Sequence, residues 1–346
     1  MTPRIATSLA MGAGLALCLA FVGLGFAQPL PTRIPFQIAT GSTGGVYFPA
    51  GEVIAGLLSH PQGSQRCEKT RLCGPSGLIV TARTSEGAAA NVVAVGSKLA
   101  SSGLAQAEVV QAAVAGKGAF RKDGPRPHLR VIASLFPEDV HLLVAVGSNI
   151  HTVSGLKGKR VALGTENSGT LNTARAVLGA WRLHERGLKA HFESPDVAAQ
   201  MLTHGELDAM FLVGGTPMPV AENLIRRKIA RLVPLSGQGL KRLLAAQPAF
   251  AADTLPPGTY TGSAAVDTVK TRAVWIVNEA QPEALIYAMT RALFEPGNAA
   301  ALRASPALRH LSLDAAPKNP PAPLHPGAAR FYRERGLLPK QTKPSP

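Results

Sequence analysis

Short apolar runs alternate along this chain with longer segments in which apolar positions recur every three or four residues. The first pattern is typical of buried strands and the second of helices that cover a sheet. Because a helix usually carries the chain between parallel strands, the alternation predicts an α/β fold with mainly parallel sheets. We expect strands at residues 36–40, 78–83, 104–106, 131–136, 141–146, 160–164, 190–193, 207–213 and 274–277. We expect helices at residues 46–59, 86–99, 108–115, 170–184, 197–203, 220–227, 283–294 and 327–335.

The N-terminal segment, residues 1–27, has the three parts of a secretory signal peptide. Arg4 supplies a positive charge, residues 9–24 form an apolar stretch, and Gly25-Phe26-Ala27 places small residues where signal peptidase cleaves. We therefore expect cleavage after Ala27 and a periplasmic protein. An uncleaved membrane anchor is the alternative, although the apolar stretch is marginal in length for spanning a bilayer.

Composition and charge narrow the possible partners. Hydrophobic residues make up 46% of the 346 residues and charged residues 16%, which indicates a sizeable core and excludes global disorder. The formal net charge of +15 is compatible with nucleic acid, an anionic membrane or small anions as partners. The sequence contains no block of five like charges, and aromatic residues make up only 5%. We therefore expect no nucleic-acid partner and favour small anions.

Two cysteines remain once the signal peptide with Cys18 is removed. Cys67 and Cys73 are spaced C-x5-C in a polar loop flanked by glycine and proline. In an oxidising compartment this spacing predicts a disulfide that closes a short loop. A metal site is the alternative, but two cysteines without nearby histidines make a poor zinc site.

Two glycine-rich junctions between a predicted strand and a predicted helix carry the candidate chemistry. They are Gly41-Ser42-Thr43-Gly44-Gly45 and Glu166-Asn167-Ser168-Gly169-Thr170. At such a junction, unpaired N–H groups and the helix dipole favour an anion, and hydroxyl groups add donors. Plain helix capping is the alternative for each loop. Two equivalent junctions indicate two lobes that each offer a helix N-terminus to one cleft, at the carboxyl ends of their strands.

The sequence has none of the motifs of nucleotide binding or of catalysis that we sought. G-x-x-x-x-G-K-[ST], G-x-G-x-x-G, G-x-S-x-G and H-E-x-x-H are all absent, and the histidines do not have ligand spacing. We therefore expect a binding protein that is not an enzyme and that carries no cofactor and no metal. A periplasmic enzyme whose site is assembled in space from separate segments is the alternative.

The motifs occur in an order that resembles a known family. Residues 38–58, IATGSTGGVYFPAGEVIAGLL, resemble the opening of the solute-binding receptors of TAXI-type TRAP (tripartite ATP-independent periplasmic) transporters. The resemblance extends over residues 36–338. Further segments that resemble this family, in chain order, are residues 73–92, 101–110, 129–170, 207–219 and 324–338.

The resemblance implies a two-lobed periplasmic-binding-protein type II fold with a ligand cleft between the lobes. Lobe 1 would comprise residues 34–136 and 240–314, lobe 2 residues 137–236, and residues 315–346 a proline-rich C-terminal segment with a short helix. Such a receptor would capture a small organic anion or an acidic amino acid and deliver it to a membrane permease of the TRAP type.

The resemblance also implies which residues bind the ligand. Tyr47 would hydrogen-bond a carboxylate or pack at its helix start, and Asn91 would face the ligand or brace its helix. The backbone of Gly215 would approach the ligand or form a plain tight turn. The full set comprises Gly41, Ser42, Thr43, Gly44, Tyr47, Ser85, Asn91, Gln106, Ser168, Gly169, Thr170, Gly215 and Thr216.

This chain departs from the family pattern near the first lobe's part of the cleft. Glu86 and Ala88 stand where the family usually has glycine and serine, and Ala107-Glu108 stands where Ser-Asp is frequent. Arg83 replaces a glutamine and would either add a bidentate carboxylate partner or lie in solvent at its strand end. These departures affect the expected ligand more than the expected class of protein.

Overall fold

The computed structural model describes residues 33–64, 67 and 73–340. The predicted signal peptide and its cleavage site lie outside the described residues. None of the helices in the described residues is long and apolar enough to cross a membrane. The predicted disulfide between Cys67 and Cys73 is present.

The first part of the chain follows the predicted alternation of strand and helix. The apolar runs form the strands because their side chains are buried against helices on the sheet faces. These elements are β1 (Ile34–Ala39), α1 (Tyr47–Leu58), β2 (Leu78–Arg83), α3 (Ala88–Gly96), β3 (Ser102–Gln106) and α4 (Ala107–Val114).

The middle of the chain repeats the alternation, and the last part adds helices that pack on the first. The middle elements are β4 (Leu129–Ala145), β5 (Arg160–Ala162), α5 (Gly169–Ala180), β6 (Lys189–His191), α6 (Pro195–Thr203), β7 (Ala209–Gly214), α7 (Pro219–Arg226), β8 (Ala230–Leu232) and α8 (Gly237–Ala246). The last elements are β9 (Ala251–Leu255), β10 (Val266–Asn278), α9 (Glu283–Leu293), α10 (Ala299–Ala304) and α11 (Pro326–Glu334). Short 3-10 helices lie at Gly118–Phe120, Val153–Leu156, Glu185–Gly187, Pro296–Asn298 and Leu308–His310.

The described strands form one ten-stranded mixed sheet, which corrects the expectation of mainly parallel sheets. Its order is β2-β1-β3-β10-β4-β7-β5-β6, with β8 beside β4 and β9 beside β10. β1 pairs in parallel with β2 and β3, and β5 with β6 and β7. Every pairing of β4 or β10 is antiparallel. The periodicity could not show this, because antiparallel long strands have the same apolar pattern as parallel ones.

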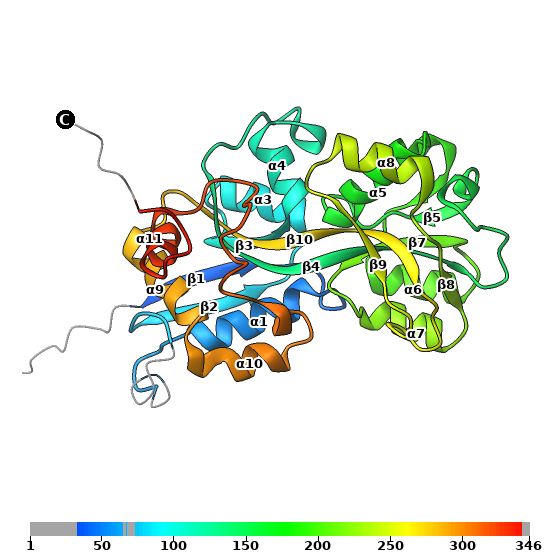
Figure 1. Cartoon of the computed structure of the whole chain (residues 1–346). Helices are drawn as coiled ribbons and strands as arrows, with labels where there is room; N and C mark the ends of the chain where they lie inside the picture. The colour runs from blue at the N-terminus through cyan, green and yellow to red at the C-terminus, as the bar shows by residue number, and fades with distance from the viewer. Residues whose placement is uncertain (1–32, 65–66, 68–72, 341–346) are drawn as a thin grey trace, which may run out of the picture. The chain divides into compact units, whose positions relative to one another are not determined.

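β4 and β10 run side by side in the middle of the sheet and connect the strands β1–β3 with β5–β7 (Figure 1). β4 is one strand, not the two predicted at 131–136 and 141–146. The polar residues Glu138 and Asp139 after Pro137 interrupt the apolar pattern, but the chain stays extended there. The chain stays extended because β4 is paired along its whole length. It pairs with β10 from Leu129 to Asp139 and with β7 from Asp139 to Val144. β10 likewise extends well beyond its predicted residues 274–277.

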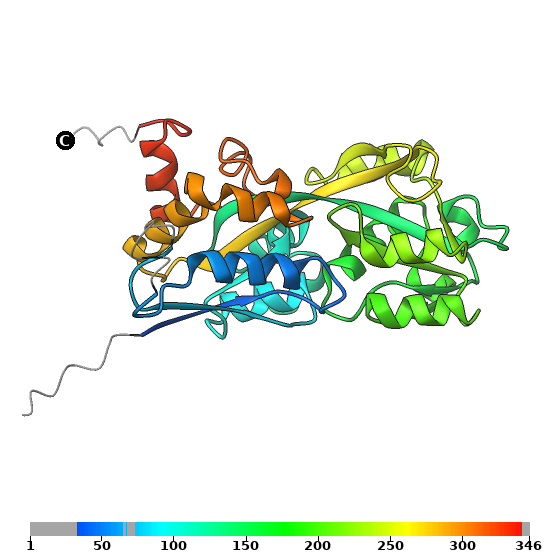
Figure 2. The same cartoon turned by 90° about the horizontal axis from the view of Figure 1, so that it is seen from below.

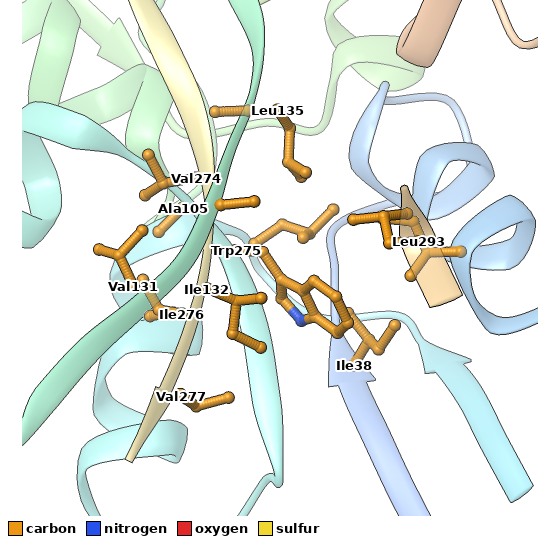
Figure 3. Close-up of a cluster of buried hydrophobic side chains, with 14 of the residues drawn as sticks. Ile38, Ala105, Val131, Ile132, Leu135, Val274, Trp275, Ile276, Val277 and Leu293 are labelled. Carbon is orange, nitrogen blue, oxygen red and sulfur yellow. The ribbon is translucent and has the colours of Figure 1, made fainter. Parts of the chain in front are cut away.

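Buried side chains form three hydrophobic cores. The first core contains the buried apolar side chains of β1–β3, α1, α3, α4, α9 and α11 and the adjoining parts of β4 and β10. Its largest member, Trp275, is fully buried and lies among Ile38, Ile132 and Leu293 (Figure 3). The second core forms around α5 and α8, and the third around α6 and α7, where they pack on β4, β5 and β7.

The C-terminal segment packs on the first core. Helix α9 contacts both α1 and α11, and its orange ribbon lies beside the blue ribbon of α1 (Figure 2). The backbone N–H of Val131 donates to Pro323 O at 3.0 Å, and that of Ser134 donates to Ala316 O at 2.9 Å. The segment between residues 240 and 270 supplies Leu243 and Val269 to the second core. The predicted lobe boundaries stay a prediction; residues 240–270, predicted in lobe 1, contribute here to the core formed by residues of the predicted lobe 2.

Candidate functional site

A cavity of about 250 Å³ lies where elements of the first core meet elements of the second and third cores. Its walls come from the loops after β1, β2 and β5, from β4 and β7, and from the start of several helices. The predicted site residues that line it are Gly41, Ser42, Tyr47, Ser85, Gln106, Ser168, Gly169 and Thr170.

Helices α1, α3, α4, α5, α6 and α7 all begin at this cavity. The N-cap residue of each of these helices is part of the lining: Val46, Gly87, Gln106, Ser168, Ser194 and Met218. The first N–H groups of a helix have no intrahelical acceptor, and the helix dipole makes this end positive. The lining therefore brings together the N-termini of six helices, whose N–H groups and dipoles favour an anion.

Local sequence explains why helices start at these positions. The Ser168 Oγ accepts a hydrogen bond from Leu171 N at 3.1 Å, and the Ser194 Oγ accepts one from Val197 N at 3.4 Å. Both are N-cap bonds that serine makes readily. Gly87 has φ +119°, a conformation that side chains rarely adopt, so glycine is required before α3.

Gln106 lies directly against the N-terminus of α5. A Cβ placed on Gly169 would come within 1.6 Å of Gln106 Oε1, so only glycine allows this approach. Gln106 is 4% exposed, and its Oε1 is buried without a hydrogen-bond partner in the described residues. This oxygen is therefore free to accept a hydrogen bond from a molecule bound at the helix N-terminus.

Glu138 and Tyr47 form a buried pair in the cavity wall. The Tyr47 hydroxyl donates to Glu138 Oε2 at 2.9 Å, and the Tyr47 ring packs edge-on against Phe136. Burial raises the pKa of Glu138 well above its usual value; the Tyr47 hydrogen bond lowers this pKa, and the nearby carboxyls of Glu108 and Asp139 raise it. Glu138 therefore holds its proton more tightly than an exposed glutamate does.

A second buried carboxyl, Glu108, lies behind the lining. It accepts hydrogen bonds from the hydroxyl of Thr173 on α5 at 2.9 Å and from that of Thr271 on β10 at 2.6 Å. Burial raises its pKa, while these two hydroxyls lower it. Glu108 thus ties α4 to α5 and β10 without contacting the cavity.

Further hydrogen bonds join the α5 side of the cavity to the α3 side. The Asn167 Nδ2 donates to Glu86 Oε2 at 2.7 Å, and Ala90 N donates to Asn167 O at 3.1 Å. The Thr165 hydroxyl donates to Glu86 O at 3.2 Å. These bonds hold the loop before α5 next to the start of α3, which encloses the cavity on that side.

The described lining contains acidic residues but no lysine, arginine or histidine. Glu86, Glu138 and Glu193 line the cavity. Arg83 is exposed and donates to Gln37 Oε1 at 3.1 Å, so it takes the solvated position at its strand end. An anion in the cavity would consequently be bound by backbone N–H groups and hydroxyls, not by a cation.

Some predicted site residues lie outside the lining. Asn91 is fully buried and donates to Thr40 O at 2.6 Å and to Leu104 O at 2.7 Å, which is the bracing role. The Thr216 hydroxyl donates to Asp139 Oδ2 at 2.6 Å. The predicted site residues outside the lining are Thr43, Gly44, Asn91, Gly215 and Thr216.

No motif in the sequence indicated Glu138 or the apolar part of the lining. Glu138 lies in the middle of a long strand, where an acidic residue has no local motif. The apolar part of the lining includes Ala162, Ala198, Phe211, Val213 and Met218. The only available signal was the position of 211–213 at the end of a predicted strand, where ligands bind in α/β folds. Among the described residues, no group of three or more His, Cys, Asp or Glu side chains is placed to hold a metal ion.

The mixed sheet, with β4 and β10 at its centre, is similar to that of solved solute-binding proteins. MatC from Rhodopseudomonas palustris, solved with bound malate, is 14% identical; the match covers 88% of this chain and 98% of that one, with a TM-score of 0.51. A protein of Bordetella bronchiseptica RB50 gives the same identity, coverage and TM-score. The alkanesulfonate-binding protein SsuA from Xanthomonas axonopodis pv. citri is 19% identical over 89% of this chain and 96% of that one, with a TM-score of 0.46.

The predicted α/β two-lobed binding fold is thereby confirmed. Residues 38–336 match the model of the NMT1-like family, and the chain belongs to this family.

Proposed function

We propose that this chain is the extracytoplasmic solute-binding protein of a TRAP-type transporter. It binds a small carboxylate anion in the cavity between its cores and delivers it to a membrane permease. The resemblance of its motifs to TAXI receptors and the fold that it shares with MatC support this proposal.

The observation that carries the proposal is the set of helix N-termini around a cavity without cationic side chains. Backbone N–H groups at helix N-termini bind carboxylates and other small anions by hydrogen bonds and by the dipole. In a low-dielectric cavity such donors act strongly because no water competes with them. The first-turn N–H groups of Gly169 and Thr170 are the best placed, since both residues line the cavity and glycine leaves the backbone accessible.

The neutral state of Glu138 is the second requirement of an anion site. A carboxylate next to an ionised Glu138 would be repelled, whereas a protonated Glu138 donates a hydrogen bond. Because burial raises the pKa of Glu138, the protonated form extends to higher pH than in water. A bound anion would raise that pKa further, so binding and protonation support each other.

The direct test is a thermal-shift screen of the exported chain against carboxylates, sulfonates and neutral solutes. A ligand present at a hundred times its dissociation constant stabilises the folded chain by about 2.7 kcal/mol. Stabilisation by carboxylates and not by neutral solutes is the expected result. If no carboxylate raises the melting temperature, the proposal is wrong. Recovery of a chemically altered ligand after incubation would favour a periplasmic enzyme instead.

Paired glycine variants locate the site on α5. Gly169→Ala places a methyl group against Gln106 and the helix N-terminus, so we expect it to abolish the thermal shift. Gly179→Ala, near the other end of the same helix, meets no atom within 4 Å and serves as the matched control. Equal shifts in both variants would contradict the assignment of the α5 N-terminus as the anion site.

Export is a separate part of the proposal. We expect the full chain, expressed in a bacterial host, to be found in the periplasm with Gln28 as its first residue. Intact-mass measurement of the periplasmic protein decides between cleavage after Ala27 and an uncleaved anchor.

A further inference from the structure

The orphaned oxygen of Gln106 restricts the ligand of the proposed site. Gln106 Oε1 is buried without a partner and lies next to the N-terminus of α5. A carboxylate bound to the N–H groups of Gly169 and Thr170 would therefore lie close to this oxygen. Two acceptors cannot face each other favourably, so the ligand must place a hydrogen-bond donor between them. A donor on the carbon next to the carboxylate meets this requirement.

The apolar residues of the lining restrict the rest of the ligand. They are Ala162, Ala198, Phe211, Val213 and Met218. An apolar wall is stabilised by contact with an apolar tail, and a charged tail would lose its hydration without compensation.

The acidic residues of the lining also disfavour a ligand with a second negative charge. Glu86, Glu138 and Glu193 line the cavity, and no described lysine, arginine or histidine does. Glu193 is partly buried in the loop before α6. A second carboxylate on the ligand would have no cation to pair with in the described lining and would be unfavourable beside the side chains of Glu86 and Glu193.

The size of the cavity allows a short tail. Its volume is about 250 Å³. One water-sized group needs only about 10–15 Å³ of such space, so the cavity has room for a carboxylate, a donor on the adjacent carbon and a short tail.

We propose that the ligand is a short monocarboxylate with a hydroxyl or amino group on the carbon next to the carboxylate and an uncharged apolar tail. This inference rests on the proposed function and is narrower than it. It excludes dicarboxylates and acidic amino acids, which the resemblance to TAXI receptors had included.

Isothermal titration of the exported chain with five probes tests the inference. 2-Hydroxy-4-methylpentanoate and leucine have the donor and the apolar tail, and they distinguish a hydroxy acid from an amino acid. 4-Methylpentanoate lacks the donor, and malate and glutamate add a second carboxylate. We expect binding of at least one of the first two probes. We expect 4-methylpentanoate to bind at least about tenfold more weakly and the dicarboxylates at least about 100-fold more weakly.

The possible outcomes separate the two proposals. If malate or glutamate binds as tightly as the best monocarboxylate, this inference is overturned while the proposed function stands. If 4-methylpentanoate binds as tightly as its hydroxy analogue, the inference is also overturned. If none of the five probes binds and no other carboxylate does, the proposed function itself fails.

Two glutamine variants test the donor requirement. Gln106→Leu removes the orphaned acceptor at similar volume, so the preference for 2-hydroxy-4-methylpentanoate over 4-methylpentanoate should fall to about one. Gln111→Leu, at an exposed position of helix α4, which begins directly after Gln106, is the matched control and should keep the preference. An unchanged preference in Gln106→Leu would refute the role of Gln106. If Gln106→Leu does not fold, the probe series on the unmodified chain still decides the inference.

Discussion

Replacement of Asn91 should destabilise the whole fold, because this residue joins three strand ends. Asn91 is 0% exposed on α3, and its Nδ2 donates to the carbonyls of Thr40 and Leu104, after β1 and in β3. Its Oδ1 accepts a hydrogen bond from the Ser85 hydroxyl at 2.7 Å, after β2. The Asn91→Ala variant removes all of these bonds at once and leaves buried polar atoms behind.

The magnitude follows from the atoms that lose a partner. A buried polar group left without its hydrogen bond costs about 1–3 kcal/mol. Thr40 O keeps a second donor. The Ser85 Oγ lies 3.1 Å from Thr40 O, and its hydroxyl donates to Thr40 O once Asn91 is replaced. Leu104 O is the main loss, and a small void adds to it. We therefore expect Asn91→Ala to lower the free energy of unfolding by about 2–4 kcal/mol.

Urea unfolding followed by circular dichroism measures this loss. The matched control is Asn223→Ala, at an exposed position of α7, which should change the free energy of unfolding by less than about 0.5 kcal/mol. A loss below about 1 kcal/mol in Asn91→Ala would show that the bracing hydrogen bonds contribute little, and the reasoning would be refuted.

Three further predictions concern the buried groups. Because burial raises the pKa of Glu138, the folded chain binds this proton more tightly than the unfolded chain, and stability should fall as pH rises above about 4.5. Glu138→Gln should weaken that dependence and raise the melting temperature at pH 7; an unchanged pH profile would contradict the assignment. The Tyr260 hydroxyl accepts from Met218 N at 3.0 Å and donates to His141 Nε2 at 2.7 Å, and burial lowers the pKa of His141 to about 4, which keeps it neutral. Tyr260→Phe removes both hydrogen bonds and should therefore lower the free energy of unfolding, measured in urea, by about 2–4 kcal/mol. A loss no larger than that of a substitution at an exposed position would contradict this prediction. Trp275→Ala should lower the free energy of unfolding by about 3–5 kcal/mol, because it leaves a cavity in the centre of the first core. A urea unfolding midpoint equal to that of the unmodified chain would disprove this.

The sequence predicted the local elements well. Most strands and helices begin and end within a few residues of their predicted bounds, because apolar periodicity and capping residues act over short segments. Ser168 specifies the start of α5 through the hydrogen bond that its side chain accepts, and Gly87 specifies the start of α3 through its backbone conformation. The strands β8 and β9 and the helices α8 and α10 were missed; β8, β9 and α10 are short, and α8 begins with polar residues and glycines.

The candidate site was predicted only in part. The loops around Ser42 and Ser168 were recognised because glycine, serine and threonine between a strand and a helix have a clear local meaning. The resemblance left Asn91 either at the ligand or as a brace, and in the structure it donates to two backbone carbonyls and accepts from the Ser85 hydroxyl. Whether a polar side chain faces a cavity or a neighbouring strand depends on packing, which the resemblance does not report.

The sequence by itself determined the alternation of strands and helices, the glycine-rich loops and the cysteine spacing, all of which depend on neighbouring residues. Only the tertiary structure decided that β4 and β10 are long antiparallel strands and that helix N-termini surround one cavity. It alone paired Tyr47 with Glu138, 91 residues apart, and left the lining without cations. The physical reason is that these properties arise from side chains that distant segments bring together, so no local pattern contains them.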